Sequence, residues 1–221
     1  MRYFKFFFIH FNLLCAPKPE FTDELFKRTN PGIVAYVYYI FRITDIIFSR
    51  YKITYWVDFG SLLGSVRHGG MIPWDDDVDI VIFLDDEAKL FSLKKKFARY
   101  GLRIKRSSIP GLIKILPKKS KFPFVDVFTA QYSPEDKNKI KLIASGWPKY
   151  YWLKDEIFPL KRVKFGPMQV SIPKDPMRHL FDLYGQDCMT MARWWNHSSG
   201  FGKLKNAKVK IKDFSPAKFK S

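Results

Sequence analysis

The sequence predicts one α/β (α+β) domain, in which helices flank a mixed β-sheet. Helical and strand patterns alternate along the chain, and some strand candidates follow one another directly, which is typical of a mixed sheet. The 221 residues are 47% hydrophobic and 18% aromatic. There is therefore ample material for a core, and this composition excludes disorder across the whole chain.

The first half of the predicted domain begins with an apolar helix. Gly32 to Tyr51 carry apolar side chains on several helical faces, which predicts a buried helix. A short strand over Ile53 to Val57 follows, and Gly60-Ser61 ends it. Leu62 to Val66 fits one or two helical turns, and the apolar run Val78 to Leu84 predicts a buried strand.

The second half adds two helices and several strands. Asp85 to Tyr100 predicts an amphipathic helix with acids in its first turn, and Asp175 to Tyr184 a short helix ended by Gly185. The strand candidates are Leu102–Ile104, Leu112–Leu116, Phe122–Phe128 and Ile140–Ile143. We expect the domain to span residues 32–200, between an apolar segment with a connector at 1–31 and a basic, loosely held tail at 201–221.

The chain is strongly basic, with a formal net charge of +18 and a pI near 9.8. This charge favours acidic partners such as nucleotides, phosphorylated sugars, nucleic acid or anionic membrane surfaces, so peripheral membrane association is one expectation. The alternative is that a lysine-rich surface only maintains solubility. Cys15 and Cys188 are the two cysteines, which argues against a structural zinc site or a disulfide framework.

The N-terminus resembles a weak signal peptide. Arg2 and Lys5 precede a short apolar run, Phe6 to Ala16, which is too short to span a bilayer unaided. The alternative is a helix or strand packed on the domain. No later segment is predicted to cross a membrane. A cytoplasmic or membrane-associated location is favoured, and a Golgi-lumen location applies if this segment is a signal or an anchor.

Four aspartates lie within five positions of this basic chain: Asp75, Asp76, Asp77 and Asp79. Asp77 and Asp79 are two residues apart at the start of a strand, so their side chains point to the same face. Two unit charges ~4 Å apart repel by roughly 4 kcal/mol at an effective dielectric of ~20. A proton or a cation must offset this repulsion, and Mg²⁺ (or Mn²⁺) suits paired carboxylates.

Asp126 is a third candidate ligand, because it lies within the apolar stretch FPFVDVF, Phe122 to Phe128. A buried acid is expensive unless it is paired or metal-bound. If this strand lies beside Val78–Leu84, Asp126 completes a metal-binding trio with Asp77 and Asp79. The alternative is that the aspartate run forms a solvated turn.

Phosphate-binding candidates lie just upstream of the acids. Gly60 and Ser61 offer backbone N–H groups and a hydroxyl, which can hold a phosphate oxygen. Arg67 and His68 add cationic or donor groups between this turn and the aspartates. Aromatic residues at 147–152 either stack on a sugar or choline, or belong to the core.

With these residues in place, GSLLGSVRHGGMIPWDDDVD (Gly60 to Asp79) resembles the signature of the LicD family, approximately G-[ST]-L-L-G-x-x-R-x-G-x-x-I-P-W-D-x-D-x-D. FVDVF resembles the family's second acidic strand, and Phe158 to Gly185 resembles its closing segment. Some family members carry a cysteine-based zinc element, which this chain lacks the cysteines to build.

The resemblance implies a nucleotidyltransferase-like fold, with Gly60 and Ser61 in its Gly-Ser turn and Asp77, Asp79 and Asp126 as its catalytic, metal-binding acids. It implies Mg²⁺-dependent transfer of a phosphorylated alcohol, such as phosphocholine or ribitol phosphate, from a CDP-alcohol onto a glycan or lipid-linked sugar. Asp75 or Asp126 then takes the acceptor's proton, and Arg67 contacts a phosphate oxygen.

Two other functions stay open at this point. The first is a nucleotidyltransferase acting on nucleic acid, although no RNA-binding aromatic motif is present and no nucleic-acid partner is expected. The second is a non-catalytic partner that binds glycans or membranes.

Overall fold

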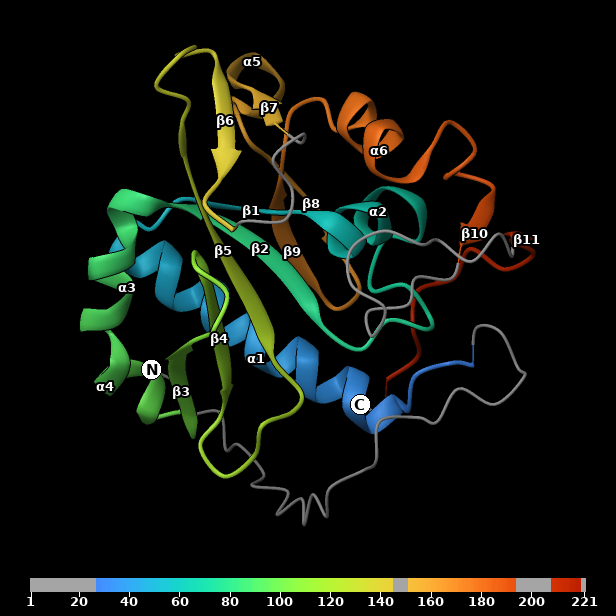
Figure 1. Cartoon of the computed structure of the whole chain (residues 1–221). Helices are drawn as coiled ribbons and strands as arrows, with labels where there is room; N and C mark the ends of the chain where they lie inside the picture. Colours follow the sequence, from blue (N-terminus) through green and yellow to red (C-terminus); the bar gives the residue numbers. More distant parts are fainter. Residues whose placement is uncertain (1–26, 145–150, 194–207, 220–221) are drawn as a thin grey trace.

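The computed structural model describes residues 27–144, 151–193 and 208–219. A seven-stranded sheet forms its centre, in the order β1-β2-β5-β4-β3, and β6 and β7 continue from β5 (Figure 1). The strands are β1 (Tyr55–Val57), β2 (Val78–Phe83), β3 (Leu102–Arg106), β4 (Leu112–Pro117), β5 (Val125–Tyr132), β6 (Lys139–Leu142) and β7 (Tyr151–Leu153). β2 and β5 are parallel, whereas the other neighbours are antiparallel. The predicted mixed α/β class is confirmed.

Helix α1 (Pro31–Tyr51) is the predicted apolar helix. The Asn30 side chain accepts a hydrogen bond from the Gly32 N–H, and Pro31 occupies the first turn, where a missing N–H costs nothing. Its buried side chains join the core of the sheet. Its length and apolar composition would allow α1 to cross a membrane, which the sequence analysis did not anticipate, although 50% of the qualifying window is buried inside the domain.

Shorter helices flank the sheet. They are α2 (Phe59–Arg67), α3 (Glu87–Ser92), α4 (Lys94–Ala98), α5 (Lys154–Ile157) and α6 (Met177–Tyr184), with a 3-10 turn at Leu84–Asp86. The single helix predicted over residues 85–100 is broken, because the backbone leaves helical geometry at Leu93 between α3 and α4. Leu90, Leu93 and Phe97, on either side of the break, are all buried in the core. Figure 1 shows α3 and α4 at one side of the sheet and α2 and α6 at the other.

A hairpin of β8 (Lys161–Phe165) and β9 (Met168–Ile172) packs against β1 and α2. This hairpin lies within Phe158–Gly185, the stretch that resembles the closing segment of the family. At its turn Gly166 adopts φ 57°, and a Cβ there would lie 2.3 Å from the Tyr38 hydroxyl, so only glycine fits.

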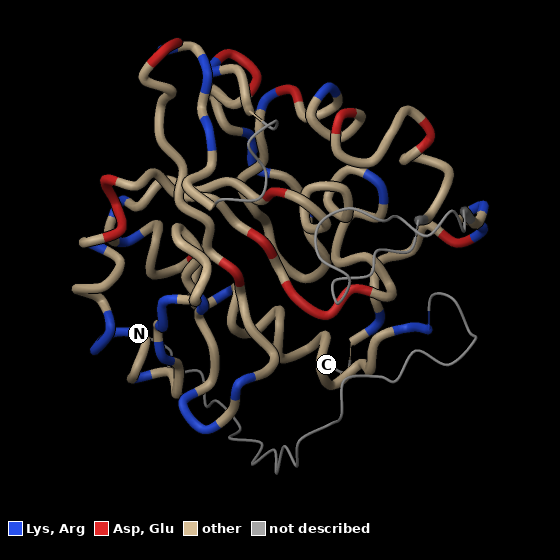
Figure 2. Tube along the Cα trace, in the orientation of Figure 1, with Lys and Arg blue, Asp and Glu red and all other residues tan. Residues whose placement is uncertain are grey.

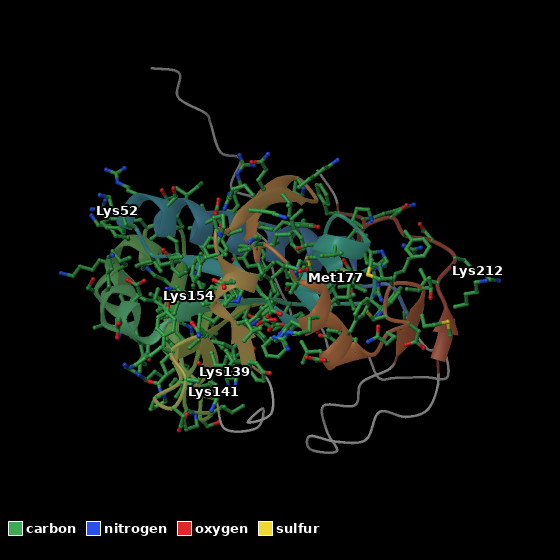
Figure 3. The ribbon with its side chains drawn as sticks, turned by 90° about the horizontal axis from the view of Figure 1, so that it is seen from above. Lys52, Lys139, Lys141, Lys154, Met177 and Lys212 are labelled. Atoms are coloured by element: carbon green, nitrogen blue, oxygen red, sulfur yellow. The ribbon has the colours of Figure 1, made fainter. Side chains whose placement is uncertain are left out.

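The C-terminal segment is bound to the domain. β11 (Lys208–Lys210) pairs with β10 (Met191–Arg193), and the Ala217 N–H donates to the Met71 carbonyl at 2.9 Å. Ile211 and Ala217 are buried. The prediction of a loosely held tail is therefore wrong for residues 208–219. Figure 3 shows the Lys212 side chain of this segment pointing away from the body, at the end opposite Lys52.

Candidate active site

Four charged residues form one row across the sheet, perpendicular to the strands. Asp79 on β2 lies opposite Asp126 on β5, and Asp126 lies opposite Lys114 on β4. Asp58, directly after β1, donates its N–H to the Asp79 carbonyl at 3.1 Å and extends the row. Because residues paired across strands share a face, the sheet register alone brings three acids and one lysine together. Figure 2 shows the acidic segments of β2 and β5 side by side at the centre of the molecule.

The predicted metal-binding trio is brought together. Ligand oxygens of Asp77, Asp79 and Asp126 all lie within 4.8 Å of one another. Asp75 and Asp76 form a second such group with Asp77, so Asp77 belongs to both. Asp77 and Asp79 are half-buried and their carboxylates lie beside Asp126 on the neighbouring strand β5, which differs from the solvated turn of the alternative prediction.

Burial disfavours the ionised form of each carboxylate in this cluster and so raises its pKa. It raises the pKa of Asp77 and of Asp79 well above the usual value, and repulsion from neighbouring acids raises it further. The pKa of Asp75 rises to about 7, mainly through burial and then through Asp76. Burial also raises the pKa of Asp126, against the opposing effect of Lys114. Burial and mutual repulsion therefore disfavour the ionised forms of Asp77 and Asp79, and a cation between them would offset both effects.

The predicted Gly-Ser turn is the first turn of α2. A Cβ on Gly60 would lie 2.7 Å from Oδ2 of Asp75, so the absence of a side chain at Gly60 makes room for that carboxylate. Ser61 is buried, and its Oγ accepts a hydrogen bond from the Asp79 N–H at 2.8 Å. Ser61 thus fixes the start of β2, and the first-turn N–H groups face no intrahelical acceptor.

Arg67 and His68 have protein partners outside the trio, although the charge of Arg67 opposes the rise in the pKa of Asp75. Arg67 is buried at the end of α2 and donates to the backbone carbonyls of Cys188 at 2.6 Å and Met191 at 3.4 Å. Its Nε donates to Nε2 of His68 at 3.0 Å. Burial, and then Arg67, lower the pKa of His68 to about 4, so His68 is neutral at pH 7. These contacts anchor the chain after α6, and the structure does not bring either side chain into the carboxylate trio.

A buried network next to the row was missed by the sequence analysis. Asp58 accepts a hydrogen bond from Nε1 of Trp152 at 2.9 Å and lies 3.0 Å from Nε2 of His179, and the two rings stack at 3.6 Å. Trp152 is therefore core, as one of the two readings predicted, whereas Trp147 and Tyr150 lie outside the described residues. His179 is 121 positions from Asp58, and no local pattern in the sequence links them.

Two further residues interact with the acids, one by direct contact and one through charge, without having been predicted. Nζ of Lys114 lies 2.7 Å and 2.9 Å from the two carboxylate oxygens of Asp126, and 3.4 Å from the centre of the Phe124 ring. The signal for Lys114 was present, as a lysine in the middle of the apolar strand LIKIL. Burial raises the pKa of Tyr184, at the end of α6, and the charges of Asp79 and Asp75 raise it further.

Asp77 just before β2, Asp79 on β2 and Asp126 on β5 lie beside a helix that carries Gly60 and Ser61 in its first turn, which is the arrangement that the sequence resemblance implied. A family model described as "LicD/FKTN/FKRP, nucleotidyltransferase domain" matches residues 52–175, more than half of the chain. The chain therefore belongs to the LicD family, as its signature indicated.

Known relatives resemble the chain over different lengths. An uncharacterized protein of Rickettsia typhi is 32% identical over 144 residues, which cover 65% of this chain and 44% of that protein. Ribitol 5-phosphate transferase FKRP of Homo sapiens is 59% identical over 34 residues, 15% of this chain and 7% of its own length. Lipopolysaccharide cholinephosphotransferase LicD of Haemophilus influenzae is 51% identical over 37 residues, 17% of this chain and 14% of its own length.

The chain thus spans less than half the length of each of these three relatives. Among solved structures, the lincosamide antibiotic adenylyltransferase LnuA aligns with a TM-score of 0.40 and 17% identity, over 65% of this chain and 82% of its own.

Proposed function

We propose that this protein transfers a phosphorylated alcohol, of the phosphocholine or ribitol phosphate kind, from a CDP-activated donor onto a glycan acceptor. The observation that supports the proposal most is the carboxylate trio of Asp77, Asp79 and Asp126, held by the parallel pairing of β2 and β5. The short, highly identical matches to a ribitol 5-phosphate transferase and a lipopolysaccharide cholinephosphotransferase support the substrate class.

The trio fits a divalent cation. Its oxygens converge within 4.8 Å, and carboxylates are the ligands that Mg²⁺ and Mn²⁺ prefer. Burial and then repulsion among the acids raise the pKa of Asp77 and of Asp79, and a cation held between them would relieve both effects. When bound there, Mg²⁺ would neutralise charge on the diphosphate and stabilise the CMP leaving group.

The protein's own groups orient the donor and move the proton. The N–H groups of Gly60 and Ser61, at the positive end of α2, are the donors that we assign to a phosphate oxygen. Asp75 lies against Gly60. It is the base that we assign to the acceptor hydroxyl as that oxygen bonds to the distal phosphorus and CMP departs, because its carboxylate lies next to Asp77 but outside the trio. Asp126 is less suited, since Lys114 already pairs with it.

Calorimetric titration tests this function. Wild type, Asp77→Asn and Asp85→Asn are each titrated with CDP-choline, CDP-ribitol and CDP-glycerol, with and without Mg²⁺. Asp85 is an exposed residue just beyond the other end of β2, so its substitution is a matched control. We expect one CDP-alcohol to bind wild type and Asp85→Asn in a Mg²⁺-dependent way, and Asp77→Asn to lose this binding.

The same titrations separate the alternatives. Equal binding by Asp77→Asn would overturn the metal role of the trio. If folded wild type binds none of the three donors but binds ATP or an oligonucleotide, the nucleic-acid function takes precedence. Binding of a glycan without any nucleotide would favour the non-catalytic partner.

A further inference from the structure

Lys114 occupies an unusual position for a lysine in a sheet. Its neighbours on β4, Ile113 and Ile115, are buried, while its own side chain is 28% exposed and lies on the same face as the carboxylates. The ammonium group contacts both oxygens of Asp126 and the face of the Phe124 ring. Two independent attractions, one ionic and one cation–π, therefore hold it at the edge of the trio.

Lys114 and a divalent cation compete for the same carboxylate. Asp126 is one of the three ligands in the trio, and both of its oxygens already accept from Nζ of Lys114. Binding of a cation to Asp126 brings a second positive charge close to the ammonium group, and the two repel each other. The ammonium group then needs another anion within its reach.

We infer that Lys114 is a phosphate-binding residue that moves from Asp126 to the diphosphate of the donor when the metal site fills. This inference rests on the proposed function, since it states how the site couples the binding of the metal ion to the binding of the donor's diphosphate. The metal alone must break the Lys114–Asp126 pair, whereas metal and diphosphate together offer the ammonium group a new partner. Lys114 thereby makes the binding of metal and of diphosphate mutually dependent.

The row of charged residues across the sheet continues from Lys114 to a second lysine on β3, which suits a phosphate-bearing ligand. Lys105 on β3 lies directly opposite Lys114 and is exposed. On this face of the sheet the charge therefore changes sign between β5 and β4, from the acids of the trio to the two lysines. A diphosphate lying across this boundary meets the metal on one side and the ammonium of Lys114 on the other.

Calorimetry of Mg²⁺ binding, with and without saturating CDP, tests the coupling. The proteins compared are wild type, Lys114→Met, Lys114→Arg and the control Lys95→Met, which makes the same charge change on α4. In Lys114→Met we expect Mg²⁺ alone to bind more tightly than in wild type, and the tightening of Mg²⁺ by CDP to fall by about fivefold or more. Lys114→Arg keeps most of the coupling, and Lys95→Met keeps all of it.

A purely structural role predicts different results. If Lys114 only holds Asp126 in place, Lys114→Met weakens Mg²⁺ binding and leaves its dependence on CDP unchanged. That result, or a Lys114→Met protein that behaves like Lys95→Met, overturns the inference.

Chemical labelling of wild type covers the case in which Lys114→Met does not fold. Acylation of the Lys114 amine, followed by mass spectrometry, is expected to increase when Mg²⁺ is added and to decrease when CDP is added as well. Unchanged labelling across these conditions overturns the inference. If CDP protects Lys114 without any metal, the lysine binds phosphate and the metal part of the proposed function fails instead. If CDP neither binds nor protects, both fail.

Discussion

The indole N–H of Trp152 donates to Oδ2 of Asp58, 94 positions earlier in the chain, at 2.9 Å. Asp58 is almost fully buried, with 1% of its surface exposed, and its other carboxylate oxygen contacts His179 and the Phe59 N–H. A charged group so buried is stable only when hydrogen bonds replace its water. Trp152 therefore connects β7 to the row of acids through a hydrogen bond that compensates the buried Asp58 carboxylate for its lost water.

Trp152→Phe keeps the aromatic ring but removes the donor to Asp58. We expect the free energy of unfolding to fall by about 1–3 kcal/mol, because a buried carboxylate oxygen loses its partner. Trp56→Phe is the matched control, since the buried Nε1 of Trp56 has no acceptor within the described residues. Urea denaturation compares the two, and an equal loss in both variants would show that the Asp58 bond contributes nothing.

Gly60→Ala is expected to impair the site while sparing the fold. The new Cβ would lie 2.7 Å from Oδ2 of Asp75 and push that carboxylate away, while alanine suits a helix better than glycine does. Transfer activity and Mg²⁺ affinity are therefore expected to fall, with a change in melting temperature of only a few degrees.

Gly64→Ala provides the contrast to Gly60→Ala. Its Cβ would lie 2.5 Å from the backbone oxygen of Gly70, so the main effect is expected on stability. Thermal denaturation beside Mg²⁺ titration checks both variants. Parallel losses of stability and affinity in the two would contradict the separate roles.

The metal-free protein is expected to lose stability as pH rises from about 4 to 8. Asp75, Asp77 and Asp79 have a raised pKa in the folded state, so folding favours their protonated forms. Their contribution is complete below the pKa of an unfolded aspartate and is lost as pH rises through the folded value, about 7 for Asp75.

Mg²⁺ should cancel this loss, because it stabilises the ionised carboxylates. Melting temperatures measured across this pH range, with and without Mg²⁺, check both statements. Asp75→Asn should flatten the metal-free profile. A metal-free profile that rises with pH would show that the acids are not strained by burial.

Arg67→Met separates an anchoring role from a phosphate-binding role. Arg67 holds two backbone carbonyls in the segment after α6, so its loss is expected to reduce the free energy of unfolding by about 1–3 kcal/mol. The affinity for CDP in the presence of Mg²⁺ should stay within about threefold of wild type, a difference below ~1 kcal/mol. A much larger drop in affinity, in a protein that still folds, would restore the role that the sequence analysis gave to Arg67.

The sequence pattern predicted the parts of the site that depend only on the geometry of a single strand. Asp77 and Asp79 share a face because strand side chains alternate, whatever the sheet order. Asp126 could be placed because an acid among valines and phenylalanines needs a partner, but its position required β2 and β5 to be neighbours. No pattern in the sequence shows which strands are neighbours. The prediction that Asp126 joins the trio was therefore conditional on that pairing.

Contacts between distant segments were beyond the sequence analysis. The register that places Lys114 opposite Asp126, and the contact of His179 with Asp58, join residues with no shared local pattern. Arg67 was assigned to phosphate because it lies between the Gly-Ser turn and the acids in the sequence. The structure places it in the last turn of α2, where it donates to the carbonyls of Cys188 and Met191, and the sequence offers no pattern for those two contacts.

The attachment of residues 208–219 bears on how this protein should be expressed in pieces. A fragment that stopped at Gly200, where the lysine-rich composition begins, would remove Pro216 and Phe219 from above Gly70 and Tyr38. It would also leave the Met71 carbonyl without the Ala217 N–H. Such a shortened protein would present an uncovered apolar face beside α1 and would self-associate on a sizing column, so recombinant versions should retain the last residues of the chain.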